Sequence, residues 1–390
     1  MEKNFNDVIN RRNTNSLKWD VGEHELPMWV ADMDFPTAEC VTKAIVKKAK
    51  SGVFGYQIVP DEWYNAINYW WLRYNFDIKK EWLCFCTGVV PAITSSIKRL
   101  TNVGDNVVVL TPVYDIFFHS IENTGRHVLE CPLVYENGSY GIDFDDLERK
   151  LALPTSTMLL LCNPHNPIGK VWTNDELCRI GNLCAKNGVT VFSDEIHCDL
   201  TAPKIKYTPF ASASEVCKDI SVTAISASKA FNLAGLQSAA VFSANQQIRD
   251  KVVRGLNSDE LAEPNAFAIE ATVAAFSNNG LTWLNALREH IAENKANVEE
   301  FLKVSLPEIK PIAQDATYLM WLDCSAFTDD AEKLADFIRA KTGLFVSAGN
   351  KYRGNGKYFL RLNVACPKAT LSDGLQRLKE GINKFKRLNK

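Results

Sequence analysis

Five groups that can bind a ligand or react stand where apolar runs of the sequence end. Gly88 follows the run LCFC, Tyr114 follows VVVL and Asn166 follows LLLC. Asp194 and Lys229 come after VTVF and SVTAIS. A loop that enters a helix offers free backbone N–H groups to an anion, and a carboxylate that ends a buried strand needs a cationic partner. The set therefore combines an anion cradle, an aromatic ring, an amide, a carboxylate and an amine.

The apolar runs themselves predict the elements that position these groups. Near-continuous apolar runs are typical of strands covered on both faces, as in a mostly parallel sheet. We expect strands at 83–86, 106–111, 127–132, 157–162, 189–193, 221–226 and 238–242. Helical patterns lie between them: Pro91 suits the first position of one helix, and a second at 173–186 ends before Asn187-Gly188. This alternation predicts an α/β fold.

The pattern changes after about residue 245. The remaining sequence predicts helices at 263–278, 281–304 and 369–385 and strands near 317–323 and 358–363. We therefore expect a large domain, 46–283, with a mostly parallel seven-stranded sheet flanked by helices. A smaller α+β domain is expected from both chain ends, 1–45 and 284–390. The stretch EWYNAINYWWLRYNF places Trp63 and Trp70 at helical spacing, which is typical of a core or a subunit interface.

The composition disfavours several classes of protein. The 390 residues carry 44 Lys and Arg against 46 Asp and Glu, whereas a nucleic-acid binder needs a basic face. We expect no membrane span, because no run of about 18 apolar residues occurs, and no signal peptide, because the start has no apolar core. The 11 cysteines lie mostly in apolar runs, so we expect free thiols and a cytoplasmic location.

Each of the five groups also has a purely structural interpretation, such as a helix cap for Asp194 or a side chain reaching solvent for Lys229. Together they are better explained by a ligand, because ligands of open α/β sheets bind outside the carboxyl ends of the strands. The set suits a phosphorylated aromatic aldehyde that forms a Schiff base with a lysine. Pyridoxal phosphate is such a compound, and it needs a lysine, an acidic partner for its ring nitrogen, a phosphate site and a ring platform.

Two other kinds of site compete with this interpretation. The stretch GNKYRGNGK at 349–357 is superficially like a P-loop, but Gly354 is followed by Asn355 rather than by lysine. A zinc site would need the ligands Cys162, His165, His197 and Cys198. These residues lack the usual paired-cysteine spacing, so we expect no metal site.

Three segments, NPHNPIG, SDEIH and SASKAFNLAGL, resemble the signature of the class I/II aminotransferases, the fold-type I pyridoxal phosphate enzymes. The resemblance covers essentially the whole chain. Within that superfamily the sequence is most similar to the cystathionine beta-lyase (C–S lyase) branch. The segments that carry this similarity are NTNSLKWD, LPMWVADMDFP, GVFGYQ, TGVVPAI, DEIHCDL, ATYLMWLDC and YFLRLNVACP.

The resemblance implies roles for individual residues. Lys229 would form the Schiff base and take the substrate's Cα proton as general base, and Asp194 would keep the ring nitrogen protonated. Tyr56 would reach the phosphate of the neighbouring subunit, so the implied catalytic residues are Lys229, Tyr56 and Asp194. Arg361 would bind the substrate α-carboxylate through two parallel hydrogen bonds.

The resemblance also implies a set of residues around the cofactor pyridoxal 5′-phosphate. The cofactor-binding set is Tyr56, Gly88, Val89, Val90, Tyr114, Asn166, Asp194, His197, Ser226, Ser228 and Lys229. The substrate-binding set is Arg361, Asn166 and Tyr114. In these sets Asn166 donates to the phenolic oxygen, Tyr114 stacks on the ring and Ser226 binds the phosphate. The role of Tyr56 implies a homodimer with shared active sites; alternatively, Tyr56 packs within its own subunit.

Two positions depart from the aminotransferase pattern. Gln237 replaces an arginine that binds the phosphate, and His197 replaces a tyrosine beside the ring oxygen, as is usual in the lyase branch. We therefore expect a pyridoxal phosphate-dependent C–S β-lyase that converts L-cystathionine or other L-cysteine S-conjugates to pyruvate, ammonia and a thiol. An aminotransferase is the alternative, and the resemblance leaves open an added role in binding a regulatory protein.

Overall fold

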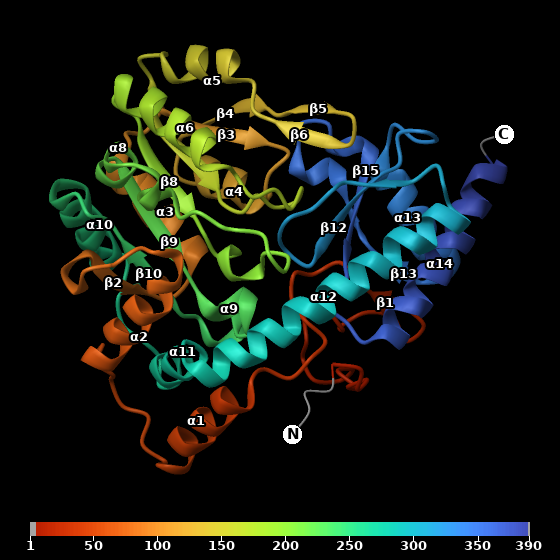
Figure 1. Ribbon diagram of the computed structural model, residues 1–390, viewed down its shortest axis with the longest axis horizontal. Helices are drawn as coiled ribbons and strands as arrows, with labels where there is room; N and C mark the ends of the chain where they lie inside the picture. Colours follow the sequence, from red (N-terminus) through yellow and green to blue (C-terminus); the bar gives the residue numbers. More distant parts are fainter. Residues whose placement is uncertain (1–4, 389–390) are drawn as a thin grey trace.

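The computed structural model describes residues 5–388, and its centre is a seven-stranded sheet in the order β2-β10-β9-β8-β7-β3-β4 (Figure 1). The strands are β2 (Leu83–Cys86), β3 (Asn106–Thr111), β4 (His127–Pro132), β7 (Ser156–Cys162), β8 (Thr190–Asp194), β9 (Ser221–Ile225) and β10 (Ala239–Phe242). Strand β10 is antiparallel to both neighbours, and the other pairs are parallel. The expected α/β fold with a mostly parallel seven-stranded sheet is therefore confirmed.

Both faces of this sheet are buried, because alternate side chains of each strand enter different apolar clusters. In β3, Val107 and Val109 belong to one cluster, and Val108 and Leu110 belong to the other. The first face is covered by α3 (Val89–Leu100), α4 (Ile116–Glu122) and α10 (Gln246–Ser258). The second face is covered by α5 (Phe144–Leu151), α6 (Asn174–Lys186), α7 (Phe210–Ala213) and α8 (Glu215–Asp219). Because both faces of the sheet are buried, apolar residues follow one another along these strands, as Val107 to Leu110 do in β3.

Helix ends follow local sequence chemistry. At the start of α6, Thr173 and Glu176 form a reciprocal capping box, which satisfies N–H groups that the helix leaves unpaired. Helix α3 begins at Val89, so the prediction that Pro91 occupies the first helical position is wrong by two residues. Pro91 is nevertheless within the first turn, where a missing N–H group costs no helical hydrogen bond.

The aromatic stretch forms α2 (Asp61–Trp71), whose Trp63, Trp70 and Trp71 are fully buried. This confirms the interpretation of the stretch as a core face. The indole of Trp70 and the guanidinium of Arg73 both donate to the buried carboxylate of Asp199, at 2.9 and 2.6 Å. Because Asp199 lies five residues after the end of β8, these contacts anchor the turn that follows that strand.

A second group of elements joins the two ends of the chain. It contains β1 (Leu26–Pro27), β11 (Lys310–Pro311), β12 (Leu319–Asp323), α13 (Ala331–Thr342), β13 (Leu344–Phe345), β14 (Ser347–Ala348), β15 (Phe359–Asn363) and α14 (Lys368–Leu388). Strand β1 pairs in parallel with β13, and β11, β12, β15 and β14 form a separate antiparallel sheet. Figure 1 shows the N-terminal segment, in red, lying against these blue C-terminal elements.

Helix α12 (Asn278–Ser305) connects the two groups and runs past residue 283 without a break. The domain boundaries at 45 and 283 stay predictions. The helix expected at 263–278 is wrong at both ends, because α11 spans only Ala268–Ala275. The remaining α-helices and strands are α1 (Glu39–Lys50), the hairpin β5 (Val134–Glu136) and β6 (Ser139–Gly141), and the short helix α9 (Ala227–Ala230).

The fold also bears on the P-loop-like stretch and on membrane-spanning helices. The stretch at 349–357 forms short 3-10 turns between β14 and β15 and leads into a strand, not into the helix that a P-loop precedes. Within residues 5–388, no helix has both the length and the apolar character that crossing a membrane requires.

Candidate active site

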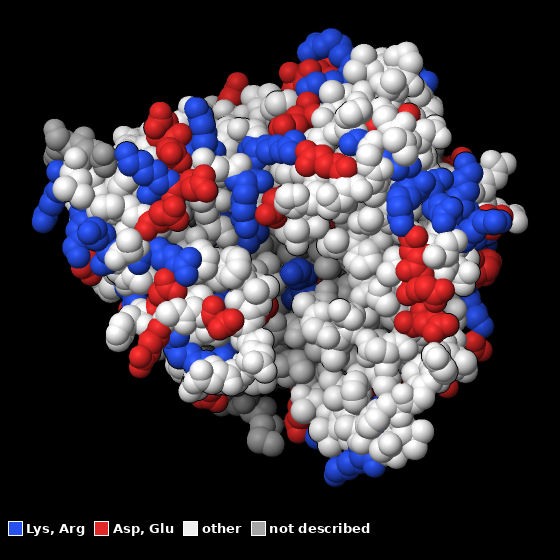
Figure 2. Space-filling view, turned by 180° about the vertical axis from the view of Figure 1, so that it is seen from behind, with Lys and Arg blue, Asp and Glu red and all other residues white. Residues whose placement is uncertain are grey.

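A cavity of about 260 Å³ lies outside the carboxyl ends of the central strands. It brings together ten residues from the predicted sets: Gly88, Val89, Val90, Tyr114, Asn166, Asp194, His197, Ser226, Ser228 and Lys229. The rear face of the molecule in Figure 2 has a hollow near its centre with a basic side chain inside, and acidic and basic side chains are interspersed around it. The structure thus collects side chains from five separate strand ends at one place.

One end of the cavity is suited to an anion. The backbone N–H groups of Val89 and Val90 belong to the first turn of α3, where no helical carbonyl accepts them. Next to them, the hydroxyl of Ser226 accepts the Ser228 N–H at 3.0 Å and donates to the Ser238 carbonyl at 2.6 Å. A helix N-terminus also carries the positive end of its dipole, so a phosphate group fits this end.

A carboxylate faces the cavity from the end of β8. Asp194 is 4% exposed, and its Oδ1 accepts the Ile196 N–H at 3.1 Å. Burial raises the pKa of Asp194 to about 7, against the opposing effects of that hydrogen bond and of Lys229. A positively charged group beside it would restore the ionised form. The carboxylate of Asp194 could therefore accept a hydrogen bond from the protonated nitrogen of a pyridine ring.

The amine of Lys229 projects from α9 into the same cavity and donates to the carbonyl of Ala31 at 2.8 Å. Burial lowers the pKa of Lys229 to about 8, and the positive charge of Arg361 acts in the same direction. The amine is therefore closer to its neutral, nucleophilic form at neutral pH than an exposed lysine is.

Arg361 does not line the cavity but stands directly behind one of its walls. From β15 it donates to Asn166 Oδ1 at 3.3 Å and to the carbonyl of Trp29 at 2.9 Å, and its Nε has no partner although it is buried. The guanidinium thus keeps free hydrogen-bonding capacity next to Asn166, a lining residue.

His197 and Tyr114 complete the walls. Burial lowers the pKa of His197 to about 3, with help from the charges of Lys229 and Arg361, so its ring is neutral. Its Nδ1 is buried without a partner. Tyr114 lines the cavity and meets Phe117 edge-on, with ring centres 6.0 Å apart.

Tyr56, unlike Arg361, neither lines the cavity nor contacts its wall within the single chain. It is 98% exposed, and its neighbours Val53, Phe54 and Ile58 are 71%, 55% and 80% exposed. The alternative in which Tyr56 packs beside the aromatic helix of its own chain is therefore wrong.

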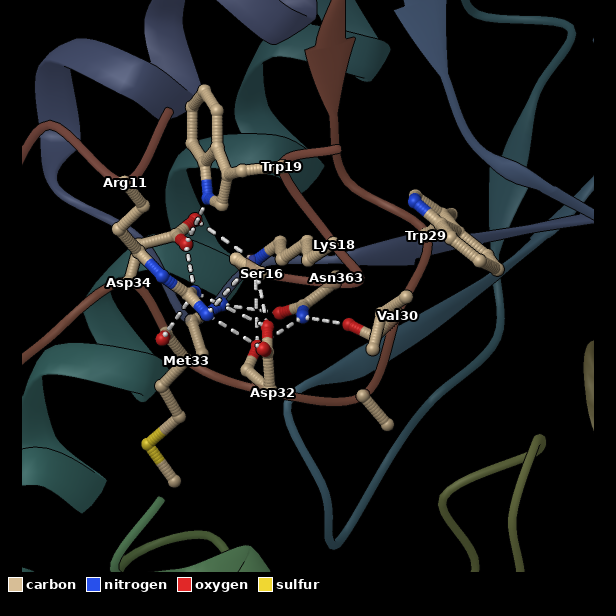
Figure 3. Close-up of polar contacts among 12 residues, drawn as sticks. Arg11, Ser16, Lys18, Trp19, Trp29, Val30, Asp32, Met33, Asp34 and Asn363 are labelled. Carbon is tan, nitrogen blue, oxygen red and sulfur yellow. Dashed lines mark hydrogen bonds and ion pairs between the residues drawn. The ribbon is translucent and has the colours of Figure 1, made fainter. Parts of the chain in front are cut away.

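Residues 29–34 have a role that the sequence alone did not indicate, because Ala31 lines the cavity. Figure 3 shows the polar contacts that surround this segment. The carbonyl of Ala31 accepts from both Lys229 and the hydroxyl of Tyr318. The amide of Asn363 donates to the carbonyls of Val30 and Asp32, at 2.6 and 2.7 Å. The backbone of this segment is thereby fixed at successive residues. The motif WVADMDF carried the family resemblance, but its neighbours could not be seen in sequence.

A cluster of ion pairs anchors the end of this segment (Figure 3). Arg11 contacts Asp32 and Asp34, each at 2.8 Å, and Lys18 contacts Asp34 at 2.8 Å. The indole of Trp19 donates to the same carboxylate at 2.8 Å. Lys18 is only 1% exposed, so removal of Asp34 would leave a buried side chain without its ion-pair partner at 2.8 Å. Two acidic residues in an otherwise apolar motif were a signal that such partners must exist.

Further lining residues not assigned to the site by sequence are Ala31, Thr87, Pro91, Cys162, Ile196, Ala234 and Ser238. Gln237, known from the sequence as a departure from the family pattern, also lines the cavity. Across the part of the chain that the structure describes, no group of three or more His, Cys, Asp and Glu side chains could hold a metal ion.

Comparison with known proteins agrees with this geometry. The chain belongs to the family of class I and II aminotransferases, whose model matches residues 25–378. Cystathionine beta-lyase PatB of Bacillus subtilis (strain 168) is 42% identical to it over 387 residues, which are 97% of this chain and 100% of that protein. The resemblance inferred from the motifs is confirmed.

Two solved structures share the fold over almost the full chain. Cystalysin from Treponema denticola, which contains a pyridoxal 5′-phosphate cofactor, is 32% identical, with a TM-score of 0.95 and coverage of 98% of this chain and 100% of that one. The PLP-bound C–S lyase from Staphylococcus hominis is 30% identical, with a TM-score of 0.92 and 98% coverage of both chains. These likenesses confirm the expected fold of PLP-dependent transferases.

The ion pairs of Asp34 yield a first prediction. Asp34→Asn removes the charge that holds Arg11 and Lys18, so the Ala31 carbonyl should no longer be fixed beside Lys229. We expect kcat/KM to fall about 10- to 100-fold, as for a small displacement of a positioned group. Asp20→Asn, which changes an exposed aspartate directly after Trp19, is the control. A lower melting temperature with unchanged kcat/KM would show that Asp34 stabilises the fold without positioning the site.

The buried carboxylate yields a prediction about pH. Because the pKa of Asp194 is raised from 3.8 to about 7, its contribution to stability is present below the unfolded value and is lost as pH rises through the folded one. Relative to Asp194→Asn, the free energy of unfolding of the cofactor-free protein should therefore fall by about 1.4 kcal/mol per pH unit across this range. Urea unfolding of both proteins over the range measures it.

Addition of cofactor provides the matched comparison for that experiment. A protonated ring nitrogen beside Asp194 would hold its carboxylate in the ionised form, so the fall should disappear in the loaded protein. A difference between the two proteins that does not depend on pH would contradict the assignment of the raised pKa to Asp194.

Proposed function

We propose that the protein is a pyridoxal 5′-phosphate-dependent C–S β-lyase that acts on L-cystathionine or other L-cysteine S-conjugates. The observation that carries the proposal is a single cavity lined by the amine of Lys229, the carboxylate of Asp194 and the N-terminus of α3. The names of two similar proteins, a cystathionine beta-lyase and a C–S lyase, support the choice of reaction. We infer a cytoplasmic location from the free cysteines.

When bound, pyridoxal phosphate supplies an electron-accepting ring that stabilises negative charge at Cα of an attached amino acid. Asp194 would hold a proton at the ring nitrogen, the first turn of α3 and Ser226 would bind the phosphate, and Tyr114 would provide the platform for the ring. Lys229 would hold the cofactor and, once free, would take the proton from Cα. Its lowered pKa suits this step, because a general base works best near the working pH.

Arg361 and Asn166 orient the substrate. The guanidinium binds the α-carboxylate in a bidentate geometry that lysine cannot reproduce, and its bond to Asn166 fixes its plane. After Cα has lost its proton, the C–S bond at Cβ breaks and the thiolate leaves with the bonding electrons. With one water consumed, the remaining carbon skeleton yields pyruvate and ammonia.

Transamination is the alternative, because it shares the first proton transfer. It would need the proton to return to the cofactor rather than a group to leave from Cβ. The departures at Gln237 and His197 favour elimination, since both positions line the cavity and both differ from the arginine and the tyrosine of the aminotransferase pattern.

We infer that the active protein is a homodimer in which Tyr56 reaches the partner's phosphate. A tyrosine that is 98% exposed within a run of exposed apolar side chains is unusual for a lone chain and is typical of an interface. Gln237 in place of an arginine leaves the phosphate with fewer charged donors, which makes an outside hydroxyl more important.

One experiment separates the lyase from the aminotransferase. L-Cystathionine offered without any keto acid should yield pyruvate and free homocysteine in equal amounts. Lys229→Ala should lose the yellow absorbance of the lysine-bound cofactor and at least about 100-fold in turnover, the scale of a lost general base. Near-normal turnover in that variant would contradict the role of Lys229, and product formation only with a keto acid would contradict the lyase.

Mixing two inactive variants tests the shared site. Tyr56→Ala and Lys229→Ala are each expected to be nearly inactive as homodimers. If Tyr56 acts across the dimer, one site of the mixed dimer carries both defects and the other carries neither, so activity returns after refolding the two together. Mixed dimers confirmed by mass that stay inactive would show that each site is built from one chain.

A further inference from the structure

The loop between β14 and β15 is fixed against the edge of the proposed active site. The N–H of Val113 donates to the carbonyl of Tyr352 at 3.0 Å. At Gly354, whose φ is +55°, a Cβ would lie 3.0 Å from the backbone nitrogen of Pro112. The ring centre of Tyr352 lies 5.0 Å from the guanidinium carbon of Arg361. The loop therefore contacts both the residues before Tyr114 and the proposed substrate-binding arginine.

Two opposite charges face each other beside these contacts. Lys351 Nζ and Asp115 Oδ2 are 3.5 Å apart, and their side chains are 40% and 20% exposed. Asp115 directly follows Tyr114, a lining residue. Within residues 5–388, neither side chain has another ion-pair partner. At this separation the pair is loose, and each group keeps unused hydrogen-bonding capacity.

A neighbouring ion pair on the same loop is built differently. Arg353 contacts Glu122 at 2.7 Å and lies 4.1 Å from the ring centre of Phe118. That arginine is held by a short contact and an aromatic face, as expected for an attachment of the loop. Lys351 also lies over an aromatic ring, with its Nζ 5.2 Å from the ring centre of Tyr352, but its contact with Asp115 is longer, at 3.5 Å. The longer ion pair leaves both groups able to bind a further partner.

The charge of Arg361, the proposed substrate-binding arginine, acts on Lys351. Burial lowers the pKa of Lys351, and the charge of Arg361 adds to this while Asp115 opposes it. Tyr352 belongs to this loop, and its ring contacts Arg361. Its hydroxyl is buried and has no hydrogen-bond partner. Lys351 and its partner Asp115 thus lie close to Tyr352, whose ring contacts the arginine proposed to bind the α-carboxylate.

We propose that Lys351 and Asp115 bind the far end of the substrate and select S-conjugates whose thiol half carries its own charges. The distal half of L-cystathionine has one carboxylate and one ammonium group, which complement Lys351 and Asp115 respectively. The inference rests on the proposed lyase function, because it concerns the part of the substrate that leaves as the thiol. Both residues lie away from Cα and Cβ, so they bind and do not react.

A series of three S-conjugates with the same two-carbon spacer separates the two charges. S-Carboxyethyl-L-cysteine has only the distal carboxylate, S-aminoethyl-L-cysteine has only the distal ammonium, and S-ethyl-L-cysteine has neither. Lys351→Met should lower kcat/KM for the first substrate about fivefold, and Asp115→Asn should do so for the second, the scale of a partly exposed charge pair. Neither variant should change kcat/KM for S-ethyl-L-cysteine.

Lys357→Met is the control, since it removes an exposed charge from the same loop, and it should change none of the three values. Equal losses on all three substrates, or no losses, would overturn the proposed selectivity while leaving the lyase intact. A wild-type protein that forms no pyruvate from any of the three would instead overturn the lyase function, and this proposal with it.

Discussion

The hydrogen bond from Lys229 to the carbonyl of Ala31 joins residues 198 positions apart and decides how the site is assembled. A buried amine needs an acceptor, because an unpaired buried charge is costly. The central sheet places the lysine, but the acceptor comes from the N-terminal segment. That segment is held in turn by Asn363 and by the ion pairs of Asp34. The reactive amine therefore depends on the two chain ends being folded together.

Burial shifts the pKa values of the ionisable groups around the cavity towards their neutral forms. Burial raises the pKa of Asp194 and lowers the pKa values of His197 and Lys229, so each shift favours the neutral form. These ionisable groups are buried with few ion-pair or hydrogen-bond partners, and their burial lowers the free energy of unfolding. A ligand with a protonated ring nitrogen and a phosphate recovers part of that cost. Pre-organisation of this kind favours tight retention of a charged cofactor.

The sequence predicted the central sheet well because double burial leaves a local signature. The boundaries of β2, β3 and β4 agree with the prediction, and Asp194 and Lys229 lie close to the ends of apolar runs. The small elements of the C-terminal part were harder: α13 has an ordinary amphipathic pattern that was not anticipated. The local hydrophobic pattern predicts individual helices and strands. The pairing of β1 with β13, by contrast, depends on contacts between residues that are far apart in the sequence.

The same limit applies to the site. Strand-end residues could be predicted as a group, since parallel strands bring their carboxyl ends to one edge. Arg361 and Tyr56 were identified through family resemblance alone, because neither their positions nor their types indicate a common cavity. The role of the Ala31 carbonyl had no side-chain signal at all, because any residue type supplies that oxygen.

The proposed chemistry and the proposed choice of substrate depend on different parts of the fold. Asp194 and Lys229 follow strands of the large sheet, where both faces are packed and displacement is costly. Lys351 belongs to a surface loop attached through Arg353 and through the backbone of Tyr352. Side chains at the tip of such a loop can change without disturbing the sheet. The proposed distal specificity could therefore vary while the proposed proton transfer at Cα stays the same.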